Sequence, residues 1–256
     1  MTAKKKSVDQ AVDDIIKSQR QSDKPLVVIL AGHNGSGKST LWYYKLADKL
    51  QIPLINADRM MLSILPEIRN ERPLPRWAVR LRDNDEAWMK VAQQGVLWFV
   101  ASAMGSKVPF AMETVFSHWK EKPEGGFESK IDLIRELQTS GYYVVLIFVG
   151  LANKELSILR VQSRVDDGGH DVKEAKLRER FPRTQQAIGM AVEIADASIL
   201  VDNSGPLEDA FQVVRVQERT DVIFDIRQRE TPAPSEAIRE WLAVICPQKS
   251  SSRVKK

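Results

Sequence analysis

The sequence has 256 residues, a length that allows one large domain or two small ones. Hydrophobic residues make up 43% and charged residues 28%, and these ordinary globular proportions exclude a wholly disordered or collagen-like chain. The formal net charge is +4, an excess that lies partly in the basic ends of the chain and therefore gives little indication of a polyanionic partner.

The sequence predicts no membrane-spanning or secretory segment. Its longest apolar stretch, residues 142–152, is shorter than the roughly 18 residues that a membrane helix needs. The N-terminus carries lysines and polar residues where a signal peptide has an apolar run. The single cysteine, Cys246, cannot form an internal disulfide. We therefore expect a cytoplasmic protein without a membrane partner.

Apolar runs and helix-like segments alternate along the chain. Helical periodicity is predicted at 7–20, 39–50, 88–103 and 127–137, and glycines at 105 and 141 are expected to end the last two. Short runs rich in Val and Ile are typical of parallel strands covered on both faces, and they occur at 25–31, 53–56, 108–112, 143–149 and 198–202. This alternation predicts a three-layer α/β fold, with a mostly parallel sheet of about five or more strands and helices on both faces.

The remaining segments are less regular. Residues 66–82 contain three prolines and five arginines, so we expect an irregular loop there. Two short strands are predicted at 213–216 and 222–226, and a closing helix at 235–245. The predicted division of the chain is an N-terminal tail and helix (1–24), a single domain (25–245, with a lid at about 160–183) and a basic flexible tail (246–256).

A glycine-rich segment after the first strand carries the strongest chemical signal. Residues 32–39 read Gly-His-Asn-Gly-Ser-Gly-Lys-Ser and match the phosphate-binding P-loop pattern. Glycines let the backbone turn tightly and point its N–H groups at phosphate oxygens. Lys38 places a positive charge on the phosphates, and Ser39 offers a hydroxyl to Mg²⁺. The predicted nucleotide-binding residues are Gly32, His33, Asn34, Gly35, Ser36, Gly37, Lys38, Ser39 and Thr40.

Two carboxylates stand where predicted strands end. Asp58 follows the strand at 53–56, and Glu113 follows the strand at 108–112. Acceptor groups in a doubly wound sheet come from the carboxyl ends of the strands. Either carboxylate could accept the proton of a substrate hydroxyl or hold Mg²⁺ through water. The structural alternatives are a helix N-cap for Asp58 and a surface carboxylate for Glu113.

A basic helix and loop follow the fourth strand. Small P-loop kinases close an arginine-bearing lid over the phosphates, which excludes water and spreads the developing charge. The pair Gly168-Gly169 suits a hinge in such a lid. The alternative is a solvated helix with ion pairs four residues apart, because acidic residues are interleaved. The predicted lid arginines are Arg160, Arg164, Arg180 and Arg183, and the P-loop favours the lid for Arg164 in particular.

In this order, these motifs resemble the zeta toxin family of P-loop kinases over roughly residues 25–204. The resemblance rests on the P-loop, Asn56-Ala57-Asp58, Glu113-Thr114, the segment 160–170 with its Gly-Gly-His, Arg180-x-x-Arg183 and Val201-Asp202-Asn203-Ser204. It implies ATP or GTP and Mg²⁺ as cofactors, and transfer of a phosphoryl group to the 3′-hydroxyl of the amino sugar in UDP-N-acetylglucosamine.

The resemblance also implies roles for individual residues. Lys38 and Ser39 take the nucleotide roles, and Asp58 takes the position of the catalytic base. Glu113, with Thr114, matches the acidic segment that contacts the substrate sugar. Arg164 matches a lid arginine that contacts phosphate.

Two departures from the family leave the acceptor open. The third-strand pattern Glu-Gly-Thr-x-Arg is replaced by residues 113–117, Glu-Thr-Val-Phe-Ser, so the substrate arginine is missing. A second lid arginine is replaced by the Gly-Gly-His region. The alternatives are another metabolite or nucleoside kinase, or a nucleotide-dependent switch or ATPase associated with nucleic acid. No nucleic-acid-binding pattern is recognisable, so we do not expect a nucleic-acid partner. Beyond the nucleotide and a small-molecule acceptor, the partners considered are an antitoxin protein and the helix at 7–20 as a built-in inhibitor.

Overall fold

The computed structural model describes residues 6–66, 74–121, 127–166, 172–228 and 233–248. Seven strands form one sheet in the order β2-β3-β1-β6-β7-β8-β9. The first five of these pair in parallel, and β8 and β9 are antiparallel. The strands are β1 (Leu26–Gly32), β2 (Leu54–Ile55), β3 (Phe110–Thr114), β6 (Tyr143–Gly150), β7 (Ala197–Asp202), β8 (Gln212–Glu218) and β9 (Asp221–Asp225). The predicted mostly parallel α/β sheet is confirmed.

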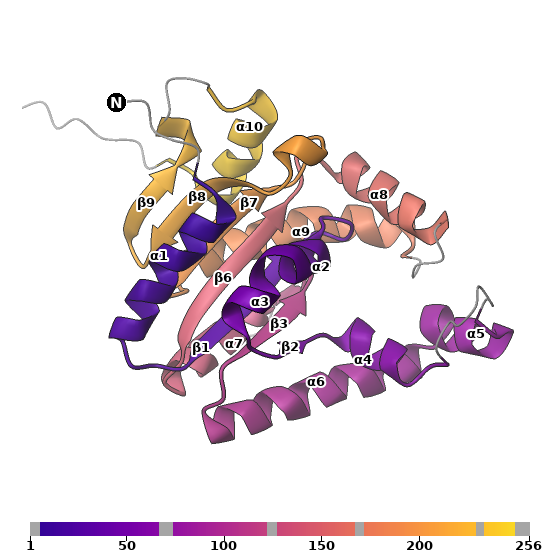
Figure 1. The fold of residues 1–256 in the computed structure, drawn as a ribbon. Helices are drawn as coiled ribbons and strands as arrows, with labels where there is room; N and C mark the ends of the chain where they lie inside the picture. Colours follow the sequence, from indigo (N-terminus) through magenta and orange to yellow (C-terminus); the bar gives the residue numbers. More distant parts are fainter. Residues whose placement is uncertain (1–5, 67–73, 122–126, 167–171, 229–232, 249–256) are drawn as a thin grey trace, which may run out of the picture.

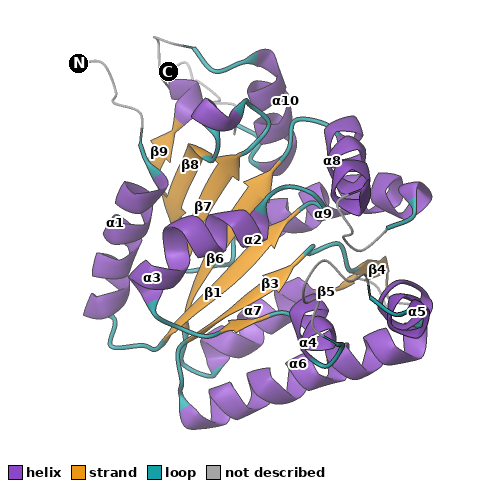
Figure 2. Ribbon diagram, turned by 45° about the vertical axis from the view of Figure 1, so that its right-hand side comes forward, coloured by secondary structure: helices purple, strands orange, loops and turns teal. Residues whose placement is uncertain are grey.

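Helices cover both faces of this sheet (Figures 1 and 2). Strand β1 is buried along its whole length, and its side chains alternate between two apolar clusters. On one face lie α1 (Val8–Gln21), α2 (Lys38–Leu41), the π-helical turn η1 (Trp42–Leu46) and α3 (Ala47–Leu50). On the other lie α6 (Glu86–Ser106), α7 (Lys130–Thr139), α9 (Glu174–Val192) and α10 (Glu236–Ile245). Burial on both faces explains why these strands read as unbroken apolar runs.

Two further groups of helices lie beside the carboxyl ends of the strands. Helices α4 (Ala57–Ser63) and α5 (Arg76–Asn84) follow β2, and α4 packs against α6. Helix α8 (Lys154–Asp166) follows β6 and packs against α9 through a small apolar cluster of its own. The chain between β3 and α7 adds a two-stranded sheet, β4 (Trp119–Glu121) with β5 (Phe127–Ser129).

Helix α1 packs into the core of the domain. Its Ser7 side chain and Gln10 form a capping box, which fixes the start of the helix. Ala11 and Ile15 are buried against the sheet. Lys49 of α3 makes an ion pair of 2.8 Å with Asp13 of α1. Deleting this helix would therefore expose the core, so a deletion could not by itself test the predicted inhibitory role.

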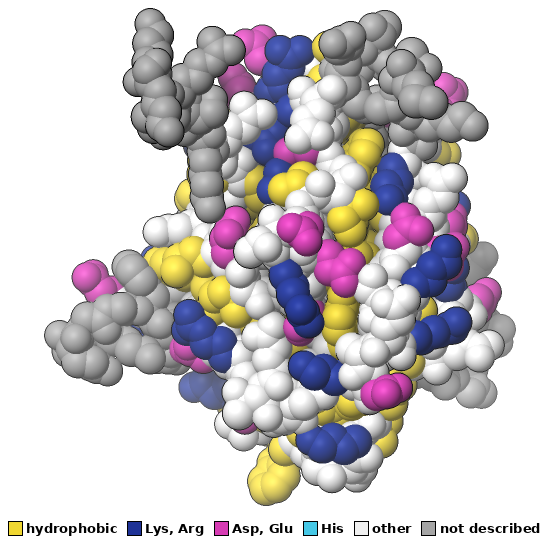
Figure 3. Space-filling model, turned by 90° about the vertical axis from the view of Figure 1, so that its left-hand side faces the viewer, with side chains coloured by type: hydrophobic (Ala, Val, Ile, Leu, Met, Phe, Trp, Pro, Cys, Tyr) yellow, Lys and Arg dark blue, Asp and Glu magenta, His cyan; other side chains and the backbone are white. Residues whose placement is uncertain are grey.

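The surface around α1 shows how the net charge is distributed. On this face Lys and Arg alternate with Asp and Glu, and hydrophobic side chains lie between them (Figure 3). Such mixing of charges is typical of a solvated surface and does not favour the binding of a large polyanion. No helix in the described part of the chain has the length and apolarity needed to cross a membrane.

The structure differs from the predicted elements in four places. Residues 76–84 form α5, although a loop was expected there; residues 67–73 of that segment lie outside the described residues. The helix expected to end at Gly105 continues to Ser106, and Lys107 caps it with a φ of 55°. Phe127 was expected in a helix but lies in β5. Cys246, assigned to the tail, is buried at the end of α10.

Candidate phosphoryl-transfer site

The P-loop joins β1 to α2, as its sequence predicts. Gly37 caps α2 with a φ of 88°, which is in the left-handed region that favours glycine. A Cβ atom on Gly32 would lie 2.5 Å from the backbone oxygen of Val149 in the neighbouring strand β6. These two positions therefore need glycine for different reasons, one for its backbone angle and one for close packing. The result is a loop that leads into a helix N-terminus, the geometry that binds phosphate.

Lys38 is buried within this loop. Its ammonium group donates hydrogen bonds to the backbone oxygens of Gly32 (3.1 Å) and His33 (3.0 Å). Burial lowers the pKa of Lys38, whereas the charges of Glu113 and Asp58 oppose that change and Arg164 adds to it. Both predicted carboxylates and the predicted lid arginine Arg164 are thus close enough to act on the charge of Lys38.

Glu113 lies at the centre of the hydrogen bonds in the site. The hydroxyl of Ser39 donates to both Glu113 carboxylate oxygens at 3.1 Å, and the amide of Asn56 donates to one of them at 2.8 Å. The ammonium nitrogen of Lys38 is 4.0 Å from Glu113. The Glu113 side chain is only 10% exposed. It is therefore a largely enclosed part of the P-loop site, unlike the surface carboxylate considered as an alternative.

Asp58 lies in the first turn of α4. Asn56 is the N-cap of this helix, because its side-chain oxygen accepts from the backbone N–H groups of Asp58 and Arg59. Asp58 is exposed and is not the N-cap. Its charge acts on Lys38 and on Arg180. The Asp58 carboxylate is therefore within electrostatic range of Lys38 and Arg180 and does not serve as the helix cap.

Helix α8 contacts the P-loop directly. The hydroxyl of Ser157 donates to the backbone oxygen of Asn34 at 2.7 Å. A Cβ atom on Gly35 would lie 3.0 Å from the Cβ of Arg160. Two predicted lid arginines, Arg160 and Arg164, are on this helix. The predicted hinge at Gly168-Gly169 lies outside the described residues.

The other two predicted lid arginines are on α9 and differ in environment. Arg180 is half-buried; burial lowers its pKa and the charge of Asp58 opposes that change. Arg183 is exposed and pairs with Glu179 one turn away at 2.8 Å. The Arg183 contact is of the kind expected for a solvated helix, which was the alternative considered for this segment.

A second support of the P-loop comes from the end of β7. The amide of Asn203 donates to the backbone oxygen of Ser36 at 2.9 Å, and its oxygen accepts from the N–H of Phe211. Burial raises the pKa of the neighbouring Asp202, and the Ser204 hydroxyl and then the charge of Arg160 oppose that rise. Sequence reasoning assigned no role to Asn56, Ser157 or Asn203. For Asn56 a signal existed, because an Asn just before a helix is a favoured N-cap.

The oxygen atoms of the site suit a magnesium ion. Among the described residues, no group of three or more His, Cys, Asp and Glu side chains is placed to hold a metal alone. Ser39 and Glu113 nevertheless present oxygen donors side by side. Mg²⁺ prefers oxygen ligands, keeps several waters and is usually shared with substrate phosphates. The residues present therefore fit a magnesium ion that a nucleotide would help to hold.

Taken together, the fold and these residues define the chain as a P-loop kinase. A glycine-rich loop, its lysine and serine, a carboxylate on the adjacent strand and arginines on the following helices surround one site. The family model of the zeta toxins matches residues 9–229, and the chain belongs to the zeta toxin family.

Several known proteins are similar to this chain. A protein of Haemophilus influenzae, described as uncharacterized, is 29% identical over 154 residues, 60% of this chain and 91% of that protein. The structure of AvrRxo1-ORF1:AvrRxo1-ORF2 with sulphate ions has a TM-score of 0.57 at 14% identity, covering 95% of this chain and 74% of that chain. Its counterpart with ATP has a TM-score of 0.56 at 13% identity, with the same coverage. The PezAT chromosomal toxin-antitoxin system of Streptococcus pneumoniae has a TM-score of 0.50 at 13% identity, covering 97% of this chain and 92% of that chain. At these identities the solved structures show a shared fold.

Proposed function

We propose that the protein is an ATP- and Mg²⁺-dependent kinase that transfers the γ-phosphoryl group to a hydroxyl of a small molecule. The observation that carries this proposal is the convergence of Lys38, Glu113 and Asp58 on one site. Phosphoryl transfer needs cations on the phosphates and a group that orients the attacking hydroxyl. Lys38 would supply the cation, and Asp58 would orient the hydroxyl.

The P-loop side of the site would bind the nucleotide. The backbone N–H groups at the start of α2 and the ammonium of Lys38 would hold the phosphates. Lys38 would then exchange its two backbone oxygen partners for phosphate oxygens. Ser39 would bind Mg²⁺ directly and Glu113 through water, and the ion would neutralise charge on the phosphates. GTP is the alternative nucleotide.

The opposite side of the site would receive the acceptor. Asp58, at the start of α4, would accept the proton of the attacking hydroxyl, the base role that phosphoryl transfer requires. Arg180, near Asp58, and Arg164, near Lys38, would stabilise the charge that develops on the transferring group. Arg160 lies against the P-loop and would contact the nucleotide. Asp58 and Thr114 are the proposed acceptor-side residues, and Glu113, which also contacts Ser39 of the P-loop, would lie between the acceptor and the magnesium ion.

The proposed acceptor is UDP-N-acetylglucosamine, at the 3′-hydroxyl of its amino sugar. This choice rests on membership of the zeta toxin family. Because AvrRxo1-ORF1 is found with ORF2 and PezAT is a toxin-antitoxin system, an antitoxin protein is the proposed partner. We also propose that the protein acts in the cytoplasm, where nucleotide and acceptor are both available.

Labelled ATP tests this function directly. The protein would be incubated with γ-labelled ATP, Mg²⁺ and a panel of nucleotide sugars, nucleosides and simple sugars that includes UDP-N-acetylglucosamine. We expect label on that nucleotide sugar. Transfer of label to another panel member would identify a different acceptor and would still support a kinase. A different result would contradict the kinase: the protein binds ATP, transfers label to no panel member, and hydrolyses ATP faster when RNA or DNA is added. That result would support an ATPase associated with nucleic acid.

A further inference from the structure

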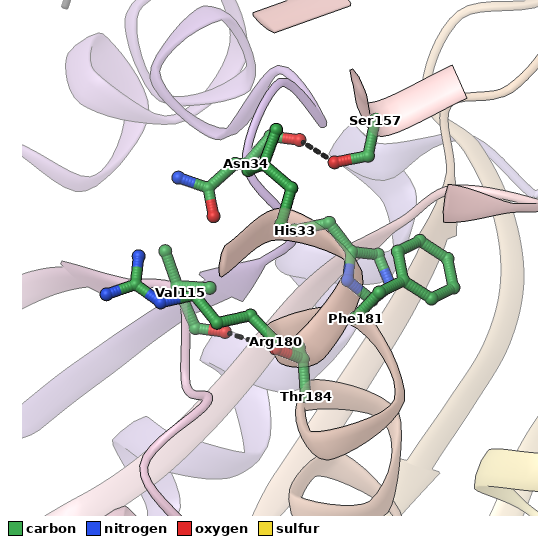
Figure 4. Close-up of a pocket in the computed structure, with 8 residues that line it drawn as sticks. His33, Asn34, Val115, Ser157, Arg180, Phe181 and Thr184 are labelled. Carbon is green, nitrogen blue, oxygen red and sulfur yellow. Dashed lines mark hydrogen bonds between the residues drawn. The ribbon is translucent and has the colours of Figure 1, made fainter. Parts of the chain in front are cut away.

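His33, the first variable residue of the P-loop, has its side chain inside the protein. It is only 2% exposed. Its ring lies parallel to that of Phe181 in α9, with 3.8 Å between the ring centroids and 10° between the planes. The ring of Phe148 in β6 lies at 77° to it, with 5.5 Å between the ring centroids. Figure 4 shows the stacked pair. The residue after Gly32 thus joins the phosphate-binding loop to a helix almost 150 positions later.

Helix α9 is attached to the site at a second point. The hydroxyl of Thr184, which is fully buried, donates to the backbone oxygen of Val115 at 3.2 Å, just after β3 ends. Between these two contacts the helix contains Pro182. Proline has no N–H and removes one backbone hydrogen bond from a helix. With one backbone hydrogen bond fewer, this turn of α9 depends more on the side-chain contacts of Phe181 and Thr184 for its position.

Arg180 lies next to these contacts. It lines the same narrow crevice as His33, Asn34 and Thr184. In Figure 4 the side chains of Arg180 and Phe181 leave the helix in different directions, Phe181 toward His33 and Arg180 away from it. The two residues are consecutive on one helix, so a shift or rotation that moves the Phe181 ring also moves the Arg180 guanidinium.

We infer that His33 is a positioning residue for phosphoryl transfer: its ring, stacked on Phe181, holds α9 so that Arg180 stays beside the phosphate-binding loop. This inference rests on the proposed kinase function. The stacked ring is the property that matters, because the Nε2 atom of His33 is buried without a hydrogen-bond partner. A phenyl ring at this position should therefore replace the imidazole.

The first test needs no substrate. Amide hydrogen exchange over residues 174–192 would be compared between the wild type, His33→Ala and His33→Phe. We expect the turn around residue 181 to exchange about tenfold faster in His33→Ala and at the wild-type rate in His33→Phe, because opening is easier where packing is lost. Unchanged exchange in His33→Ala would overturn the inference and leave the kinase proposal untouched.

The second test is a double-mutant cycle on the transfer rate. His33→Ala and Arg180→Ala should each lower kcat by about 100-fold, the loss that a misplaced group of about 1 Å can cause. If His33 acts through Arg180, the double variant should be no slower than the slower single variant. Effects that multiply would show independent roles and overturn the inference.

Three variants serve as controls in the transfer assay. His33→Phe should keep kcat within about threefold of the wild type, and its failure to do so would contradict the role of the ring. His33→Leu fills the space without a ring and stands in if His33→Ala does not fold; it should be as slow as Arg180→Ala. Met190→Ala, on the exposed side of α9, should leave both exchange and transfer unchanged. If the wild type phosphorylates no acceptor, the proposed kinase function is contradicted. The hydrogen-exchange test still shows whether the stacking of His33 on Phe181 holds α9 in place.

Discussion

Burial of His33 predicts that acid destabilises the protein through one identifiable group. An unfolded histidine has a pKa of about 6.5. In the folded protein, burial and then the charge of Lys38 lower the pKa of His33 to about 3. Below pH 6.5 the unfolded chain therefore binds a proton that the folded chain does not. Folding stability is unaffected by this group above pH 6.5 and falls as the pH decreases from 6.5 toward 3.

The size of the effect follows from these two pKa values. At pH 5, which is about 1.5 units below the unfolded pKa, the free energy of unfolding should be lower by about 2 kcal/mol, at about 1.4 kcal/mol per unit. His33→Phe keeps an aromatic ring and cannot be protonated. Because every other titratable group is present in both proteins, the difference between them isolates His33.

Urea unfolding at pH 7 and pH 5 measures this difference. From pH 7 to pH 5, the free energy of unfolding should decrease by about 2 kcal/mol more in the wild type than in His33→Phe. The m-values of the two proteins should be similar. At pH 7 His33→Phe should be at least as stable as the wild type, because a buried nitrogen without a partner costs about 1–3 kcal/mol. An equal pH dependence for the two proteins would refute the burial of a neutral imidazole at this position.

Three other variants test particular contacts. Gly37→Ala should weaken ATP binding at least tenfold in calorimetry, because φ is 88° and the new Cβ would lie 2.7 Å from an amide nitrogen; unchanged affinity would contradict the loop geometry. Asp225→Ala should lower the free energy of unfolding by about 3–5 kcal/mol, because the half-buried Arg215 and Arg227 lose the buried carboxylate that they share; a loss below about 1 kcal/mol would show that these ion pairs are solvated. Ser39→Ala should raise the Mg²⁺ concentration needed for half-maximal activity, whereas Ser39→Thr should not; equal Mg²⁺ dependence in both variants would remove the hydroxyl from the metal site.

The sequence was sufficient wherever a local pattern determines a local structure. The run at 25–31 predicts a buried strand, and β1 occupies 26–32. The P-loop motif predicts both the turn and the helix that follows, since its glycines and the helix N-terminus are adjacent in the chain. The placement of Asp58 and Glu113 near Lys38 follows from a general property of parallel sheets, whose strand ends meet at one edge.

Contacts between distant segments could not be predicted in this way. Asn203 reaches the backbone of Ser36 across 167 positions, and no local pattern specifies such a pair. His33 occupies a variable position of the motif, and its role depends on Phe181, which only the packing of α9 reveals. The helix at 76–84 was missed because its arginines and the nearby prolines outweighed its amphipathic pattern, in which Ala78 is buried.

If Asp58 and the P-loop belong to one phosphoryl-transfer site, replacing Asp58 should stop transfer while nucleotide binding persists. ³¹P NMR of a reaction with ATP, Mg²⁺ and UDP-N-acetylglucosamine can follow loss of the γ-phosphate and appearance of a new phosphomonoester together. The wild type should form the phosphomonoester. Asp58→Asn should bind ATP with an affinity within about threefold of the wild type but lose at least 100-fold in transfer rate, as expected when a general base is removed. Undiminished transfer by Asp58→Asn would contradict the account of the site.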